Sequence, residues 1–139
     1  MTSTLVDTNV LLDLATGDPM WSGWSANALR YARTNGELVI NAIVFSEISS
    51  AFDRIEEVDR FLADSSCRRE DLPWASAFVA GQAFREYRRR GGIKSSTLPD
   101  FLIGAHALVL GYALLTRDRA HYKRYFPALR ILSPPDTHP

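Results

Sequence analysis

Four carboxylates in this 139-residue chain stand where a backbone element is expected to begin or end. Asp7 follows a short β-prone segment, and Asp118 follows the apolar run 112–115 by three residues. Asp100 comes directly after a proline, and Glu47 lies in the second turn of a predicted helix, among the apolar Phe45, Ile48 and Phe52. Ligands of parallel α/β folds bind beyond the carboxyl ends of the strands. The four acids could therefore converge on one site.

Carboxylates that converge without a partner repel one another, and some of them stay protonated. A hard divalent cation removes this conflict, because Mg²⁺ and Mn²⁺ prefer oxygen ligands and keep several waters. Two such ions roughly 3.5–4 Å apart can activate a water and stabilise the leaving oxygen of a phosphodiester. Each acid by itself is also typical of a turn or of the first turn of a helix. The remaining acids considered are expected on exposed helix faces or turns: Asp13, Asp18, Asp53, Glu56, Glu57 and Asp59.

The elements that must position these side chains follow from apolar periodicity and from stop signals such as Asn35-Gly36 and Gly91-Gly92. Four segments are predicted as strands: 4–6, 37–40, 112–115 and 130–132. Seven segments are predicted as helices: 9–15, 20–34, 42–52, 55–64, 74–90, 99–110 and 119–125. The segment 67–71 suits a strand or a loop, and 93–98 a polar loop. Short strands that alternate with helices indicate an α/β domain with a mainly parallel sheet. Residues 1–139 are read as one domain with a flexible tail, 133–139.

The formal net charge is zero, but the charges are unevenly distributed. Residues 85–130 hold ten Lys or Arg residues and three acids, so the rest of the chain has six basic and thirteen acidic residues. This asymmetry indicates either a positive surface beside a polyanion site or simply solvated helix faces. The single cysteine, Cys67, excludes an intramolecular disulfide and favours a reducing compartment. With no secretion signal and no apolar run that spans a bilayer, we expect a cytoplasmic protein without membrane contact.

Five segments in order resemble a PIN-domain nuclease, and most of all the VapC toxins of prokaryotic toxin–antitoxin pairs. They are LVDTNVLLD (5–13), FSEI (45–48), LPDFLIGAHA (98–107), LTRD (115–118) and YFP (125–127). Each segment alone is weakly specific, whereas together they cover the chain from residue 4 to about residue 132. The resemblance implies a three-layer α/β/α sandwich, PIN-like, with acidic residues clustered at one edge of the sheet.

Carried over position by position, the resemblance implies that Asp7, Glu47, Asp100 and Asp118 are the catalytic acids. Asp7, Asp100 and Asp118 would be direct or water-mediated metal ligands, while Glu47 would act mainly through water or orient the nucleophile. A second group would orient these ligands or their waters: Thr8, Asn9 and Thr116.

The last motif departs from the family pattern. The run that directly follows Asp118, Arg119-Ala120-His121-Tyr122, includes no further acid, which leaves the second metal open. His121, in the same run, is interpreted as an exposed helix residue, and His106 as a packing residue of an apolar helix.

The resulting hypothesis is hydrolysis of RNA by metal-activated water, without a covalent intermediate. Lys94, Arg117 and Arg119 would guide the RNA backbone. The family resemblance implies tRNA or another structured RNA as substrate, a homodimer, and a VapB-type antitoxin whose C-terminal segment covers the acidic cleft. Exposed apolar residues of the helices within 42–62 would receive that antitoxin.

Two alternatives belong to other classes. A haloacid-dehalogenase-type phosphatase also begins with an Asp at a strand end, but it needs a second Asp two residues on, where this chain has Asn9. A non-catalytic RNA- or protein-binding scaffold of the same fold is the stronger alternative. It would be expected to lose one or more of the acids, and this chain has all four.

Overall fold

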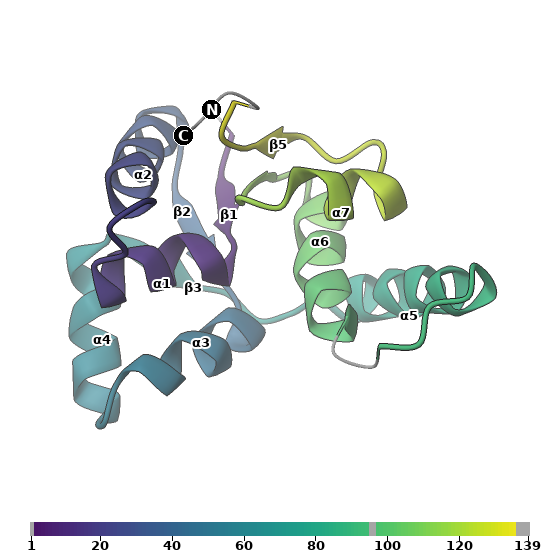
Figure 1. Cartoon of the computed structure of the whole chain (residues 1–139), viewed down its shortest axis with the longest axis horizontal. Coiled ribbons are helices and arrows are strands. Elements are labelled where there is room, and N and C mark those ends of the chain that lie inside the picture. The colour runs from purple at the N-terminus through teal and green to yellow at the C-terminus, as the bar shows by residue number, and fades with distance from the viewer. Residues whose placement is uncertain (1, 95–96, 136–139) are drawn as a thin grey trace.

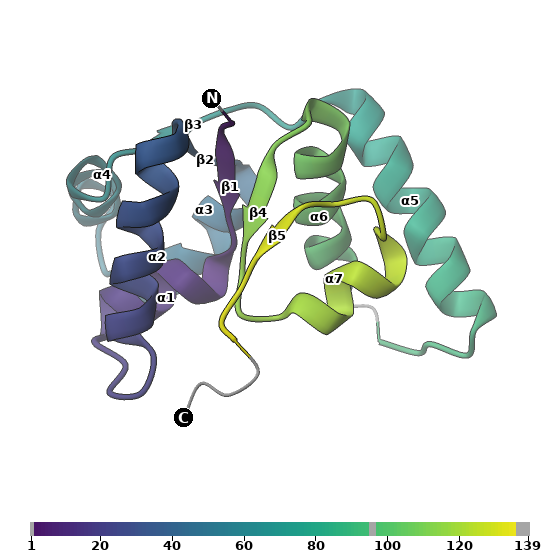
Figure 2. The ribbon, with the colours of Figure 1, turned by 90° about the horizontal axis from the view of Figure 1, so that it is seen from above.

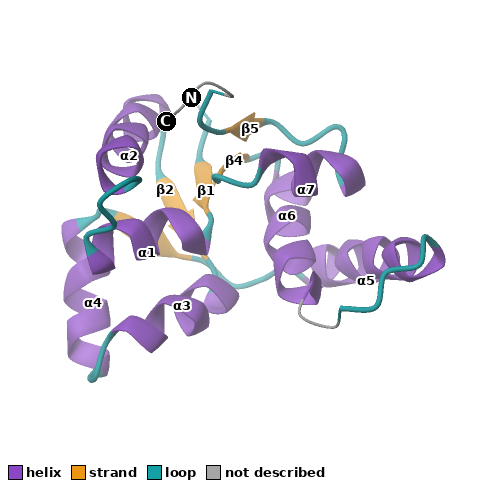
Figure 3. Cartoon of the chain, viewed as in Figure 1, coloured by secondary structure: helices purple, strands orange, loops and turns teal. Residues whose placement is uncertain are grey.

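The centre of the computed structural model, which describes residues 2–94 and 97–135, is a sheet of five parallel strands (Figures 1 and 3). The strands are β1 (Thr4–Val6), β2 (Leu38–Ile40), β3 (Cys67–Arg69), β4 (Ala113–Leu115) and β5 (Ile131–Leu132). Their order in the sheet is β3-β2-β1-β4-β5. The segment that suited a strand or a loop is therefore a strand over Cys67–Arg69. Residues 95–96 of the predicted polar loop and 136–139 of the predicted tail lie outside the described residues.

Helices cover both faces of this sheet. They are α1 (Thr8–Thr16), α2 (Ser22–Asn35), α3 (Ala42–Ile48), α4 (Ile55–Asp64), α5 (Trp74–Arg89), α6 (Leu98–Leu110) and α7 (Arg119–Tyr125). Figure 2 shows α1 and α2 on one side of β1 and β4, and α6 on the other side with α5 packed outside it. The predicted three-layer α/β/α sandwich with a mainly parallel sheet is confirmed.

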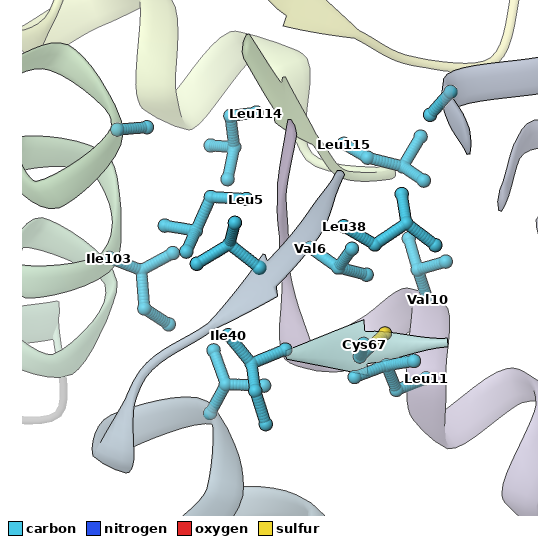
Figure 4. Close-up of a cluster of buried hydrophobic side chains, with 14 of the residues drawn as sticks. Leu5, Val6, Val10, Leu11, Leu38, Ile40, Cys67, Ile103, Leu114 and Leu115 are labelled. Carbon is cyan, nitrogen blue, oxygen red and sulfur yellow. The ribbon is translucent and has the colours of Figure 1, made fainter. Parts of the chain in front are cut away.

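The central strands β1, β2 and β4 are buried throughout and, apart from Thr4, apolar, because helices cover both faces of the parallel sheet there. The edge strand β3 instead carries Arg68 and the exposed Arg69. Successive side chains point to opposite faces. In Figure 4, Leu5 and Leu114 point toward Ile103 of α6, whereas Leu115 points toward the side of Val10 of α1. Burial on both faces therefore fixes the register of these three-residue strands, because a shift by one residue would exchange the two sets of side chains.

The order of the strands reverses between β1 and β4. The chain proceeds from β1 outward through β2 to β3, and then returns to the other side of β1 for β4 and β5. Val6 pairs with Leu115 at the carboxyl ends of β1 and β4, and the Asp7 N–H donates to the Leu115 carbonyl at 2.9 Å. Ligands of open α/β sheets bind at such a reversal. The geometry brings the segments after β1 and β4 together at this edge.

The helix predicted over 42–52 is shorter than expected. Helix α3 ends at Ile48, and a 3-10 turn follows over Ser49–Ala51. The Ser49 hydroxyl donates to the Phe45 carbonyl at 2.6 Å, and the Ser50 hydroxyl to the Glu47 carbonyl at 2.9 Å. Serine hydroxyls that bond to backbone carbonyls in this way compete with the backbone amides of the helix, which explains the early end.

His106 does more than pack against apolar neighbours. The Asn41 side-chain amide donates to His106 Nδ1 at 3.0 Å, so Nε2 carries the proton and donates to Glu70 at 2.9 Å. Burial alone would raise the pKa of Glu70, but hydrogen bonds from His106, Tyr112 and Arg68 outweigh it and lower that pKa. The interpretation of His106 as a packing residue is therefore incomplete, since this network joins α6 to the ends of β2 and β3.

None of the helices in residues 2–94 and 97–135 is both long enough and apolar enough to cross a membrane.

The contact between α6 and α7 requires a glycine. A Cβ at Gly104 would lie 2.7 Å from the Phe126 ring and 3.0 Å from the Tyr122 ring. Both rings are buried, so neither can move aside without displacing α7. Because Asp118 lies at the start of α7, this contact also sets the distance of that carboxylate from the sheet.

We expect Gly104→Ala to lower the free energy of unfolding by about 1–3 kcal/mol, because overpacking strains the two rings. The matched control is Gly81→Ala on α5, where a Cβ would meet no atom within 4 Å. There the gain in helix propensity should stabilise the protein by about 0.5–1 kcal/mol. Urea denaturation of both variants measures the difference, and equal effects would contradict the packing argument.

Candidate active site

Asp7 lies at the junction of β1 and α1, and its carboxylate is held by three donors. Its Oδ1 accepts the Thr8 N–H at 2.8 Å, while Oδ2 accepts the Thr116 hydroxyl at 2.7 Å and the Asn9 amide at 3.3 Å. Only 4% of Asp7 is exposed. The carboxylate is therefore fixed in orientation at the carboxyl edge of the sheet.

Thr8, Asn9 and Thr116 connect the segments around this carboxylate. The Thr8 hydroxyl donates to Glu47 Oε1 at 2.6 Å, which ties the start of α1 to α3. The Thr116 hydroxyl also accepts the Asp118 N–H at 3.0 Å and lies 3.3 Å from the Asn9 amide nitrogen. The three residues predicted to orient ligands thus contact Asp7, Glu47 or the backbone of Asp118. Their part in catalysis stays a prediction.

Asp100 and Asp118 lie at the starts of two further helices. Asp100 belongs to the first turn of α6, and Asp118 immediately precedes α7 and is exposed. With Asp7 at the start of α1, three of the four predicted acids stand at helix N-termini. The partial positive charge of a helix N-terminus stabilises a carboxylate. The folded chain therefore supplies some of the positive potential that these acids need.

The four predicted acids interact electrostatically. Burial first, and then the charges of Asp7, Glu47 and Asp118, raise the pKa of Asp100 to about 7. Burial also raises the pKa of Asp7, with a smaller contribution from Glu47, although the hydrogen bonds from Thr116 and Thr8 act against it. The structure thus brings together all four acids that the sequence singled out. Whether they are catalytic stays a prediction.

Two residues of α7 extend this cluster. Tyr122 was not predicted as a site residue, and His121 was predicted to be exposed. The Tyr122 hydroxyl is buried without a hydrogen bond of ordinary geometry, and burial and the charges of Asp7 and Asp100 raise the pKa of Tyr122 well above its usual value. His121 is not exposed as predicted: its ring stacks on Phe101, and Nε2 lies 3.5 Å from Asp100 Oδ2. Their spacing of three and four residues after Asp118, one helical turn, is the signal that could have indicated both.

Asp13 also differs from expectation, and its partner is Arg117. Asp13 is buried, 3% exposed, and not on an exposed helix face. It accepts the Ser25 hydroxyl and two hydrogen bonds from the Arg117 guanidinium, which has this internal partner instead of a fully solvated position. Lys94 and Arg119, the other two predicted RNA contacts, are exposed.

A family model described as the PIN domain matches residues 4–127. The chain belongs to the PIN domain family. No curated protein matches it in sequence.

Three solved structures show how closely this PIN domain follows known folds. VapBC2 from Rickettsia felis, bound to a promoter DNA fragment, has a chain with a TM-score of 0.72 and 21% identity, covering 94% of this chain and 98% of that one. A chain of VapBC-1 from nontypeable Haemophilus influenzae has a TM-score of 0.70 and 17% identity, and the match covers 94% of this chain and 97% of that one. A chain of DNA-bound VapBC from Salmonella typhimurium has a TM-score of 0.69 and 22% identity, and the match covers 96% of this chain and 98% of that one. At these identities the likeness establishes the fold.

The donors of this PIN domain fit a hard divalent cation. Within residues 2–94 and 97–135, no three His, Cys, Asp or Glu side chains form a ready-made set of direct ligands. Mg²⁺ needs only one or two protein carboxylates, because it keeps several waters. A cation among the four acids would offset the repulsion that raises the pKa of Asp100. The residues therefore fit an ion held partly through water.

The raised pKa of Asp100 predicts how stability depends on pH in the metal-free protein. Between its ordinary pKa of 3.8 and about 7, the unfolded chain has released a proton that the folded chain keeps. The free energy of unfolding therefore falls as pH rises through this window, and it falls no further for this reason above it. We expect Asp100→Asn to remove this loss and to stabilise the protein at pH 8 by about 1–2 kcal/mol, a value reduced for solvent screening because 39% of the side chain is exposed.

Urea denaturation in EDTA from pH 4 to pH 8 measures this effect. The advantage of Asp100→Asn over the natural chain should grow up to about pH 7 and then level off. Asp64→Asn, the same chemical change at an exposed position of α4, is the matched control. Parallel pH profiles for Asp100→Asn and the natural chain would contradict the coupling among the acids.

Proposed function

We propose that this PIN domain is a Mg²⁺- or Mn²⁺-dependent endoribonuclease and acts as a VapC-type toxin. The observation that carries the proposal is the interaction of four carboxylates, from four separate segments, at the reversal of strand order. Carboxylate oxygens grouped at such an edge are the donors that Mg²⁺ and Mn²⁺ prefer. The proposed site of action is the cytoplasm, where a toxin meets cellular RNA.

Each acid has a proposed role. Asp7, Asp100 and Asp118 would hold the ion, directly or through water, and Glu47 would accept a proton from the attacking water or orient it. A bound divalent ion supplies a water of lowered pKa and a counter-charge for the phosphodiester. The number of ions, one or two, stays open. The Thr8 hydroxyl orients Glu47, while Asn9 and Thr116 orient Asp7, so the carboxylates keep one geometry as the substrate arrives.

The proposed substrate is RNA, with tRNA or another structured RNA as the expected class. Lys94 and Arg119 are exposed and are proposed to contact phosphates. Ten of the sixteen basic residues lie within 85–130, the stretch that also holds Asp100 and Asp118. This uneven distribution supports the proposal, because basic side chains near an acidic cluster attract a polyanion.

The proposed protein partners are a VapB-type antitoxin and a second copy of the chain. The similar structures are VapBC complexes, and this supports an antitoxin partner. A hollow between α3 and α4 fits such a partner, since it is lined by the apolar Phe45 and Ile55 beside the charged Arg69 and Glu70. Phe45 and Ile55 lie within 42–62, where the sequence predicted the antitoxin surface, whereas Arg69 and Glu70 lie beyond it. The homodimer stays a prediction.

A non-catalytic binding scaffold of the same fold is the alternative function. It would not need its carboxylates close together, because their mutual repulsion costs stability without a cation. All four acids are present and interact in this chain. That observation favours the enzyme.

RNA cleavage with Mg²⁺ or Mn²⁺ tests the proposal. We expect Asp7→Asn and Asp100→Asn each to lower the cleavage rate by about 10²-fold or more, because each removes a ligand or a charge that stabilises the transition state by several kcal/mol. EDTA should abolish cleavage, and Asp64→Asn should retain the natural rate. Cleavage that survives both active-site substitutions would sink the assignment, and metal binding without cleavage would favour the scaffold.

The role of Thr116 gives a separate prediction. Thr116→Val keeps the shape of the side chain but removes the hydroxyl that donates to Asp7 and accepts from the Asp118 backbone. We expect a 10–100-fold loss of metal affinity or of cleavage rate, and recovery in Thr116→Ser, which restores the hydroxyl. Mn²⁺ titration followed by cleavage assays measures both. A Thr116→Val protein with the affinity and rate of the natural chain would exclude the role.

A further inference from the structure

The Asp13–Arg117 pair lies beside the acidic cluster but outside it. Arg117 Nε donates to Asp13 Oδ2 at 2.9 Å, and Arg117 Nη2 donates to Asp13 Oδ1 at 3.0 Å. The Asp13 side chain is 4% exposed and the Arg117 side chain 28%. The guanidinium also lies over the Trp21 ring, 4.8 Å from its centre. Two parallel hydrogen bonds of this kind fix both position and orientation.

The pair ties the end of β4 to the helix that begins at Asp7. Asp13 lies on α1, and Arg117 stands between Thr116 and Asp118. The Arg117 backbone N–H also donates to Asn9 Oδ1 at 3.2 Å. The segment that carries Asp118 is thus attached to α1 at two points, Asn9 and Asp13, about one helical turn apart. Attachment at two points restrains both the distance and the rotation of that segment.

We propose that Arg117 is a positioning residue: its pairing with Asp13 sets the place of Asp118 relative to Asp7, and it does not serve as an RNA contact. This inference rests on the proposed function of the site. Asp118 is exposed, so its place depends on how its backbone is held, by the packing of α7 on α6 and by the attachment of its segment to α1. A displacement of about 1 Å in a catalytic group costs roughly 10²-fold in rate.

The geometry favours this role over phosphate binding. Taking Arg117 away from Asp13 would leave a buried carboxylate without its cation, which is a costly state. A phosphate would therefore have to compete with a bidentate partner that is already in place. Arg119, two residues further on, is exposed and is the better RNA contact.

Kinetics of RNA cleavage by Arg117→Lys and Arg117→Gln separate the two roles. As a positioning residue, Arg117 should affect kcat, with a fall of about 10–100-fold and a raised Mn²⁺ concentration at half-saturation, while KM for RNA and its salt dependence stay unchanged. Arg119→Gln should do the opposite: KM should rise, and the slope of log affinity against log salt should weaken by about one. Arg33→Gln, at an exposed position of α2, controls for loss of a positive charge.

Asp13→Asn tests the pair from its other member. It should give the same fall in kcat as Arg117→Gln, and the double variant should lose little more than either single variant, because both remove one interaction. Thermal denaturation by circular dichroism identifies any variant that does not fold. If Asp13→Asn or Arg117→Gln does not fold, the test relies on Arg117→Lys, because this variant keeps a positive charge beside Asp13.

The outcomes distinguish the inference from the function on which it rests. Arg117 variants with a raised KM, a weaker salt slope and natural kcat would overturn the positioning role. Absence of RNA cleavage by the natural chain would overturn the proposed function instead. In that case Mn²⁺ binding followed by electron paramagnetic resonance still tests the inference: weakened binding in Asp13→Asn and Arg117→Lys supports it, and unchanged binding refutes it.

Discussion

Repulsion among carboxylates is the constraint on which this structure depends. Burial and three neighbouring acids raise the pKa of Asp100 to about 7, and burial raises that of Asp7. The fold reduces this cost without removing it. Asp7 receives three hydrogen bonds, and three of the acids stand at helix N-termini, where the helix dipole favours negative charge. The remaining repulsion is what a divalent cation would neutralise, so the destabilised arrangement and the proposed activity have one physical origin.

The topology of the sheet decides which segments bring their carboxylates together. β1 and β4 are neighbours at the reversal of strand order. The connection from β1 to α1 and the connection from β4 to α7 therefore begin side by side. The Thr116 hydroxyl joins the two by donating to Asp7 and accepting from the backbone of Asp118. Asn9 and the Asp13–Arg117 pair add further ties between the same connections. Side chains thus add to the backbone pairing in holding together the connections at this edge of a sheet whose strands have only two or three residues.

Much of this arrangement follows from the sequence. Runs of apolar residues and stops at glycine or proline are properties of consecutive residues, and they placed the helices and strands within a few residues of their observed ends. The positions of Asp7 and Asp118 after strands and of Asp100 in the first turn of a helix followed from the same local patterns. Agreement with PIN-domain motifs then joined the separate acids into one expected site. In the fold the four acids interact electrostatically, and their catalytic role stays a prediction.

The sequence by itself determined the order of elements, the parallel α/β architecture and the identity of the four acids. Only the tertiary structure decided the partners of charged and polar side chains. Asp13 and Arg117 are 104 residues apart, and His106 and Glu70 are 36 apart, so no local pattern marks either pair. Asp13 was predicted to be exposed and is buried, because a carboxylate can be buried wherever a distant partner compensates its charge. Burial of a charge depends on that partner, and the partner is chosen by the packing of the whole chain.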